Sequence, residues 1–390
     1  MSSTESLAQH AAALNEAWRA QGLERHEREF GSGQEPEALV DGRRVLLFSS
    51  SNYLGLAQHP RLLAAATEAT RRFGAGSGGS RLTTGTTALH RELERSIAEW
   101  LGTEDAIFFA TGYQANLSTL AAIGGPDVLI LSDELNHASI IDGARLARAR
   151  VAVFPHGDLD AAERILASRP EPHALVVSDG LFSMHAAVAD LPGLSTIARQ
   201  HGAWTMIDDA HAIGTLGEEG RGSVEVHGQH PDLLIGTASK ALGVEGGFVA
   251  ARSDIIRFLR HRARSYMFST APTPATVAAV HAAITLLRED PSPVRALQRN
   301  ARLLSTLLAD AHLIPHALST PIIPVPVGDS RRAMRIAARL EDAGVLIPAI
   351  RYPTVKEGEA ILRATVMATH TEEHIRRCAE AVVEAMAEDA

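Results

Sequence analysis

Short apolar runs alternate with segments of helical length between residues 105 and 250, and this rhythm constrains the fold more than any other feature of the sequence. Several runs are apolar on both faces, which is typical of strands buried on both sides of a parallel sheet. The runs occupy residues 105–110, 127–131, 150–154, 174–177, 203–207, 232–236 and 247–250. Most are separated by segments long enough for helices, including 114–123, 139–149, 158–168 and 192–201. The alternation predicts an α/β fold, a doubly wound domain on a mostly parallel seven-stranded sheet.

The flanking regions predict two further parts of the chain. Residues 1–48 are expected to form an N-terminal helix and arm, with the helix in residues 2–22, where Leu7, Leu14 and Trp18 recur at helical spacing. We expect this helix to pack on another surface and residues 24–45 to be irregular. The large domain is expected to cover residues 49–285, and a smaller C-terminal α+β domain residues 286–390. In the smaller domain the patterns predict helices at about 293–311, 330–343 and 371–387, with strands at 322–327, 345–350 and 361–366.

Charge and cysteine content exclude several classes of function. The net charge is −9 and no basic run occurs, so a surface for nucleic acid or anionic membrane is not expected. The single cysteine, Cys378, excludes an intrachain disulfide and every multi-cysteine metal motif, and we predict no metal site. No stretch reaches the length of a membrane span. We therefore expect a soluble, cytoplasmic protein.

Lysine is rare in this chain. Lysine and arginine together number 37, and only Lys240 and Lys356 are lysines. A lysine can become a neutral amine and form a Schiff base, whereas arginine keeps its proton. Lys240 stands in a loop of small residues, 236–247, where the backbone can approach a ligand closely. The alternative is a surface lysine in an ordinary turn.

Polar side chains follow the predicted strands at their carboxyl ends, where ligands bind in open parallel sheets. Taken alone, each residue has an ordinary explanation as a core histidine, a solvated turn or a connecting loop, but their placement at one sheet edge favours a site. They are Thr111, Gly112 and Tyr113 after the first run, then Asp133, Asn136 and His137, then Asp179 and Ser183, then Asp208, Asp209 and His211, and finally Thr237, Ser239 and Lys240.

These groups suit pyridoxal phosphate. This cofactor needs an amine, an anion site for its phosphate and a carboxylate that keeps its pyridine nitrogen protonated. Lys240 would supply the amine and Asp208 the carboxylate, and the helix expected after Thr111 would offer its N-terminus to the phosphate. His137 would stack on the ring, and His211 would hydrogen-bond the phenolic oxygen.

A glycine-rich segment, residues 74–85, is a weaker signal. Its many N–H groups suit either an anion or a plain linker. It follows no clear strand and lacks the phosphate-binding lysine, so it matches neither the dinucleotide nor the P-loop fingerprint.

Several motifs in fixed order resemble the α-oxoamine synthases over nearly the whole chain. These are pyridoxal-phosphate enzymes of the fold-type-I transferase class, acyltransferases that condense an amino acid with an acyl thioester. Within the family the chain is most similar to the branch that makes 8-amino-7-oxononanoate for biotin from L-alanine and a pimeloyl thioester. The motifs are Asn52-Tyr53-Leu54-Gly55, Gly76-Ser77-Gly78-Gly79-Ser80-Arg81, Leu135-Asn136-His137-Ala138-Ser139, Asp208-Asp209-Ala210-His211 and Ser239-Lys240-Ala241-Leu242-Gly243.

The resemblance implies roles for individual residues around the cofactor. Lys240, His137, Asp208 and His211 would be catalytic, with Lys240 bonded covalently to the cofactor. Gly112, Tyr113 and Thr237 would hold the phosphate, with Ser183 nearby.

It also implies contacts to the substrates and to a second subunit. Asn52 and Arg363 would position the amino-acid carboxylate, while Arg25 and Arg351 would face the acyl donor, a coenzyme A or carrier-protein thioester. Thr270 would reach the cofactor phosphate of the neighbouring subunit, which implies a homodimer with a shared active site.

Two departures from the family pattern concern the substrate side. The usual Phe-Ser-Met-Asp-Gly is Phe182-Ser183-Met184-His185-Ala186 here, and the usual Pro-Pro after the substrate-side arginine is Tyr352-Pro353. Three alternatives stay open at this point: a 2-amino-3-ketobutyrate CoA ligase using glycine and acetyl-CoA, a secondary-metabolism synthase with another acyl chain, and a scaffold that keeps only the fold.

Overall fold

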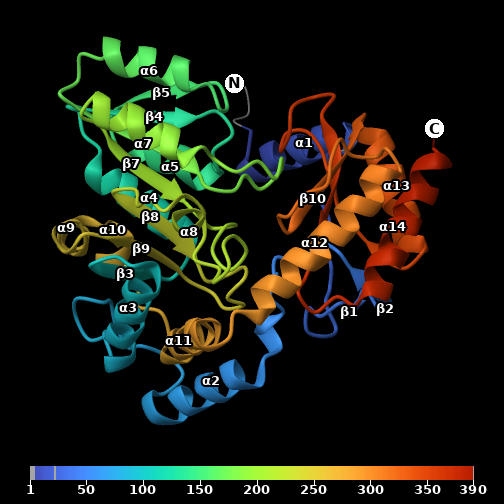
Figure 1. Cartoon of the computed structure of the whole chain (residues 1–390), viewed down its shortest axis with the longest axis horizontal. Coiled ribbons are helices and arrows are strands. Elements are labelled where there is room, and N and C mark those ends of the chain that lie inside the picture. The colour runs from blue at the N-terminus through green and yellow to red at the C-terminus, as the bar shows by residue number, and fades with distance from the viewer. Residues whose placement is uncertain (1–4, 22, 390) are drawn as a thin grey trace.

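A seven-stranded sheet forms the core of the larger lobe in the computed structural model, which describes residues 5–21 and 23–389 (Figure 1). Each apolar run predicted from the sequence forms one of its strands, so this prediction is confirmed. In spatial order they are β3 (Asp105–Phe109), β9 (Gly247–Ala251), β8 (Leu233–Thr237), β7 (Trp204–Asp208), β6 (His173–Asp179), β4 (Val128–Asp133) and β5 (Arg150–Phe154). All neighbours are parallel except β9, which runs antiparallel to β3 and β8.

Alternate residues of the strands enter two different cores, one on each face of the sheet. On β3, Phe108 belongs to the larger core and Ile107 to the smaller one. Helices α4 (Gly112–Ile123), α5 (Ala138–Leu146) and α9 (Ser253–Arg262) contribute to the smaller core. Helices α3 (Ala88–Leu101), α6 (Leu159–Ser168), α7 (Leu191–Gln200) and α11 (Pro274–Glu289) contribute to the larger one. Both faces are therefore covered, as the two-sided apolar runs predict.

Short elements connect and flank these layers. They are α2 (Pro60–Phe73), which packs on α11, together with the 3₁₀ turn η1 (Leu56–Gln58), α8 (Ser223–His227) and α10 (Arg264–Met267). Helix α3 begins after Thr87 and ends at Gly102, whose φ of 71° suits glycine.

The C-terminal residues form a second lobe beside the large sheet (Figure 1). Its antiparallel sheet contains β10 (Ile322–Gly328), β13 (Ala360–Thr365) and β12 (Ala349–Ile350). Helices α12 (Ser292–Asp310), α13 (Ser330–Asp342) and α14 (Glu372–Ala387) accompany it. The predicted strand at 345–350 is wrong as a single element, because Val345–Leu346 form β11 in another sheet and Pro348 separates it from β12.

The expectation of irregular structure at 24–45 is also wrong. Strands β1 (Glu37–Val40) and β2 (Arg43–Leu47) lie there as a hairpin, and β11 pairs with β2 in parallel. Ala38, Val40, Val45 and Leu47 form a small core with Met367.

The predicted N-terminal helix is present as α1 (Leu7–Ala20), but the described residues of this chain bury none of its side chains. Leu7 is 83% exposed and Trp18 44%. None of the helices in the described part of the chain combines the length and apolar character needed to cross a membrane.

A buried ion pair ties the glycine-rich segment to the sheet. The Arg81 guanidinium donates to Glu94 on α3 at 2.8 Å and to the Phe108 carbonyl on β3 at 3.0 Å. Glu94 also accepts the Phe108 N–H at 3.1 Å, and both charged side chains are almost fully buried. Thus residues 74–85 are held by a structural anchor and do not line the cavity described below.

We predict that Glu94→Ala lowers the free energy of unfolding by about 3–5 kcal/mol, because it leaves the Arg81 charge buried without a partner. Glu99→Ala on the same helix is the matched control. Glu99 pairs with Arg288 at 3.1 Å on the surface, where such pairs contribute up to about 1 kcal/mol. Urea denaturation of both variants measures the difference; equal losses would contradict the anchoring role of Glu94.

Candidate active site

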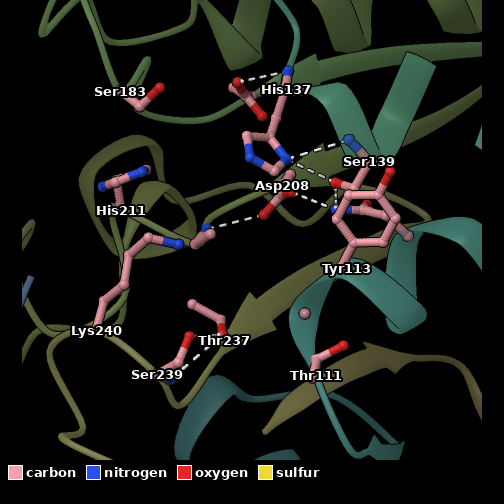
Figure 2. A pocket seen from close by; sticks show the side chains of 14 residues that line it. Thr111, Tyr113, His137, Ser139, Ser183, Asp208, His211, Thr237, Ser239 and Lys240 are labelled. Carbon is pink, nitrogen blue, oxygen red and sulfur yellow. Dashed lines mark hydrogen bonds between the residues drawn. The ribbon is translucent and has the colours of Figure 1, made fainter. Parts of the chain in front are cut away.

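A cavity of about 190 Å³ lies at the carboxyl ends of β6, β7 and β8, beside the start of α4 (Figure 2). Polar side chains from strand ends far apart in the sequence converge on it because parallel strands end at one edge of the sheet. Its lining is Thr111, Gly112, Tyr113, Asn116, His137, Ser139, Asp179, Ser183, Asp208, Ala210, His211, Thr237, Ser239 and Lys240. The structure therefore brings together all the predicted cofactor-binding residues except Thr270.

The start of α4 offers an anion site. Thr111 is the N-cap, and its hydroxyl accepts the Gln114 N–H at 3.1 Å. The N–H groups at the first positions of a helix have no partner within it and carry the positive end of the helix dipole. A Cβ atom at position 112 would come within 3.1 Å of Thr237, so Gly112 keeps the backbone open to a ligand. This cradle suits a phosphate group.

Asp208 ends β7 as a fixed, buried carboxylate, 4% exposed. Its Oδ1 accepts the Ala210 N–H at 2.9 Å, and its Oδ2 accepts the Asn116 Nδ2 donor at 2.5 Å. Asn116 also donates to Ser139 at 3.0 Å, while its own Oδ1 is buried without a partner among the described residues. The carboxylate and this unpaired amide oxygen both suit a polar ligand in the cavity.

Lys240 points into the same cavity (Figure 2). Burial lowers the pKa of its ammonium below the ordinary value, and the charge of Arg363 lowers it further. The carboxylates of Asp208 and Asp179 oppose this shift in pKa. The net effect is a larger fraction of neutral, nucleophilic amine near neutral pH.

Two imidazoles face this amine. His137 caps α5, where its Nδ1 accepts the Ser139 N–H at 3.2 Å. His211 pairs its Nδ1 with the Tyr53 hydroxyl at 2.8 Å. Burial lowers the pKa of both rings, and the Lys240 charge adds to this at His211. Both rings are therefore favoured in their neutral forms.

Asp179 is a second buried carboxylate, and it lies beside Asp208 on the neighbouring strand. Burial and the charge of Asp208 raise its pKa well above the usual range. Its Oδ2 accepts the His137 backbone N–H at 3.2 Å, which fixes the start of α5. Asp179 thus supports the placement of the His137 ring.

The other predicted site residues lie outside the cavity wall. Arg363 is buried behind it and donates to the Ser183 carbonyl at 2.6 Å. Asn52 is buried too, with its amide shared between the Gln34 carbonyl at 3.0 Å and the Ala57 N–H at 3.2 Å. Thr270 is exposed, and its backbone forms an isolated antiparallel β-bridge with Ser80.

Arg25, which is exposed, and Arg351, which is half-buried, do not line the Lys240 cavity. Arg25 donates to the Thr354 hydroxyl at 3.3 Å, and Arg351 donates to the Glu24 carbonyl at 3.1 Å. Both arginines therefore connect the N-terminal segment to the loop that follows Arg351.

Sequence reasoning missed two residues that orient the site, Asn116 and Tyr53. Asn116 stands one helical turn after Gly112 and so faces the same side as the predicted cradle, a signal that could have been read from spacing. Tyr53 was noted only as part of a motif, and its contact with His211 spans 158 positions of the chain.

Comparison with known proteins assigns the family. The model of the aminotransferase class I and II family matches residues 43–382. The chain belongs to this family. The biotin biosynthesis bifunctional protein BioWF of Cutibacterium acnes is 48% identical over 372 residues, which cover 94% of this chain. This chain spans only 57% of that bifunctional relative.

A second relative is matched over nearly its whole length. The 8-amino-7-oxononanoate synthase of Bordetella petrii is 46% identical, with 93% of this chain and 94% of the relative covered. Among solved structures, serine palmitoyltransferase of Sphingomonas wittichii matches with a TM-score of 0.93 and 31% identity, covering 100% of this chain and 99% of the other. These matches confirm the predicted fold and the resemblance to α-oxoamine synthases.

We predict that the Lys240 amine of this family member titrates below the ordinary lysine value, because burial in the cavity disfavours its charge. Reductive ¹³C-methylation followed by NMR gives one lysine signal for each residue, after hydroxylamine has removed bound carbonyl compounds. Asp208→Asn should lower the Lys240 pKa further, since the Asp208 charge raises it. A Lys240 signal that titrates at the ordinary lysine value would contradict the prediction.

Proposed function

We propose that the protein is an 8-amino-7-oxononanoate synthase of biotin biosynthesis, a pyridoxal-phosphate-dependent acyltransferase. It would condense L-alanine with a pimeloyl thioester of coenzyme A or a carrier protein. The observation that carries the proposal is the meeting of Lys240, Asp208 and the start of α4 in one cavity. Relatives named 8-amino-7-oxononanoate synthase support the choice of substrates, at 46% identity in Bordetella petrii and 44% in Geobacter sulfurreducens.

The residues of the cavity fit pyridoxal phosphate. Gly112, Tyr113 and Thr237 would hold the phosphate, and the buried carboxylate of Asp208 would face the pyridine nitrogen. His137 would stack on the ring, with His211 at the phenolic oxygen and Ser183 at the edge. A structure described as SPT with PLP, 30% identical with a TM-score of 0.92 over 97% of each chain, supports this choice of cofactor.

When bound, the cofactor withdraws electrons from the α-carbon of an attached amino acid and so makes its α-proton acidic. Lys240 would hold the cofactor covalently through its amine. Its Nζ, when free, would accept the proton from the α-carbon. Asn116 and the Ala210 N–H both donate to Asp208 and would orient its carboxyl group toward the pyridine nitrogen.

The condensation balances without an oxidant or reductant. A carbon–carbon bond forms between the α-carbon and the thioester carbonyl, and the carbon–sulfur bond breaks to release the thiol. The α-carboxylate leaves as carbon dioxide, and a proton returns to the α-carbon. Arg363 and Asn52 would position this carboxylate, and Arg25 and Arg351 would face the acyl donor.

The assembly and the division of the chain are part of the proposal. Thr270 is exposed, next to the anchored glycine-rich segment, where it could reach a neighbouring subunit's cofactor phosphate. A homodimer with a shared active site, located in the cytoplasm, would follow. The parts of each protomer would be residues 1–48, 49–285 and 286–390.

We predict that Lys240→Ala reduces kcat at least about a thousandfold, because both the covalent attachment and the proton acceptor are lost. Added ethylamine should restore part of the rate by replacing the missing amine. Product formation from L-alanine and pimeloyl-CoA, followed by mass spectrometry, measures both effects. Substantial turnover by the variant without added amine would refute the role of Lys240.

The visible spectrum tests the cofactor and the amino acid together. We expect the purified protein to absorb visible light once loaded with pyridoxal phosphate and the band to shift with L-alanine more strongly than with glycine or L-serine. A preference for glycine would favour the 2-amino-3-ketobutyrate ligase instead. A protein that stays colourless with added cofactor would leave only a scaffold.

A further inference from the structure

A second cavity, of about 350 Å³, adjoins the first at Ser183, which lines both. Three separate segments form it: the loop after β4, the loop after β6, and the residues between β12 and β13. Its apolar wall contains Leu135, Ile141, Phe182, Met184, Pro353 and Val355. Its charged or titratable members are Glu134, His185, Lys356 and Glu359. The cavity thus combines a surface for methylene groups with a few ionic side chains.

The residues that distinguish this chain gather here. His185 and Tyr352, the two departures noted in the sequence, both line this cavity. So does Lys356, the only lysine of the chain besides Lys240. None of the three lines the cavity of Lys240, so both departures from the family pattern lie at the second cavity.

Lys356 is held loosely. Its nearest carboxylate is Glu134 at 3.6 Å, with the lysine side chain 66% exposed and the glutamate 36% exposed. Glu134 itself is fixed from the other side, because it accepts the His156 N–H at 3.1 Å and this bond lowers its pKa. An exposed pair at this distance is weak, and its ammonium can turn toward a better-placed anion.

We infer that the second cavity receives the acyl chain of the thioester and that Lys356 pairs with the carboxylate at the far end of that chain. This rests on the proposed function, in which the acyl group is a dicarboxylic acid bound through one end. The methylene groups would lie on the apolar wall. The thioester end would lie at Ser183, where the two cavities meet and the Lys240 pocket begins.

Glu134 provides a second test of the inference, because its charge opposes binding of the substrate carboxylate. Its negative charge pairs with the Lys356 ammonium in the free protein and repels an incoming carboxylate. Removing the Lys356 charge and removing the Glu134 charge should therefore change the preference for a dicarboxylic acyl chain in opposite directions.

The test compares pimeloyl-CoA with heptanoyl-CoA, which has the same chain length but no terminal carboxylate, on the holoenzyme with L-alanine. We expect Lys356→Met to lower the ratio of the two kcat/KM values about tenfold, mainly through KM for pimeloyl-CoA. Lys356→Arg is the matched control that keeps the charge and should keep the ratio within about threefold. Glu134→Gln, which retains an acceptor for the His156 N–H, should raise the ratio.

Two outcomes would overturn the inference. If Lys356→Met slows both donors equally, the lysine contacts the coenzyme A phosphates that both share. If Lys356→Met slows neither donor, the carboxylate binds elsewhere.

Calorimetric titration with unreactive thioether analogues of both donors separates this inference from the proposed function. It measures the same preference as a ratio of Kd values without requiring turnover. A wild-type protein that prefers the dicarboxylic analogue but forms no product would contradict only the synthase reaction. Formation of product without any preference in binding would contradict only the role of Lys356.

Discussion

The buried carboxylate of Asp208 is the constraint on which the site depends. A charge at the end of a central strand is unfavourable unless donors satisfy it, and here Asn116 and the Ala210 N–H do so. These donors come from α4 and from the turn after β7. The requirement therefore fixes the start of α4, which is also the anion cradle, relative to the strand that carries the carboxylate. The opposed effects of burial and carboxylate charge on the pKa of Lys240 follow from the same geometry.

The large sheet is predicted well from the sequence because each of its strands is marked by residues that are adjacent in the chain. Strands buried on both faces are continuous apolar runs, and the polar residues after them meet wherever parallel strands end. Short strands outside the large sheet lack such continuous apolar runs. β1 and β2 are only four and five residues long and begin with charged residues, and β11, the partner of β2, lies about three hundred residues further along the chain. Pro348, between β11 and β12, separates what looked like one strand into members of two sheets.

The candidate site divides in the same way. Residues at strand ends, such as Asp208 and Lys240, could be placed from spacing alone. Tyr53 acts through a contact with His211 that no pattern in its own neighbourhood reveals. Asn116 could have been placed on the cavity side of its helix from its spacing to Gly112, but its contact with Asp208 lies 92 positions away in the sequence. The roles predicted for five further residues rest on the resemblance to the α-oxoamine synthases. These residues are Asn52, Arg363, Arg25, Arg351 and Thr270. They stand behind or beyond the cavity wall of the single chain, so their predicted roles depend on substrate or on a second subunit.

The antiparallel direction of β9 has a consequence for how this enzyme can change. β9 begins, rather than ends, at the site, and Gly247 lies in register between Phe109 and Thr237 at the ends of the neighbouring strands. A Cβ atom there would come within 2.4 Å of the Gly112 backbone. A side chain at position 247 therefore cannot reshape the floor of the cradle. Under the proposed function, changes in acyl specificity would instead arise in the loops around residues 182–185 and 352–356, which line the second cavity.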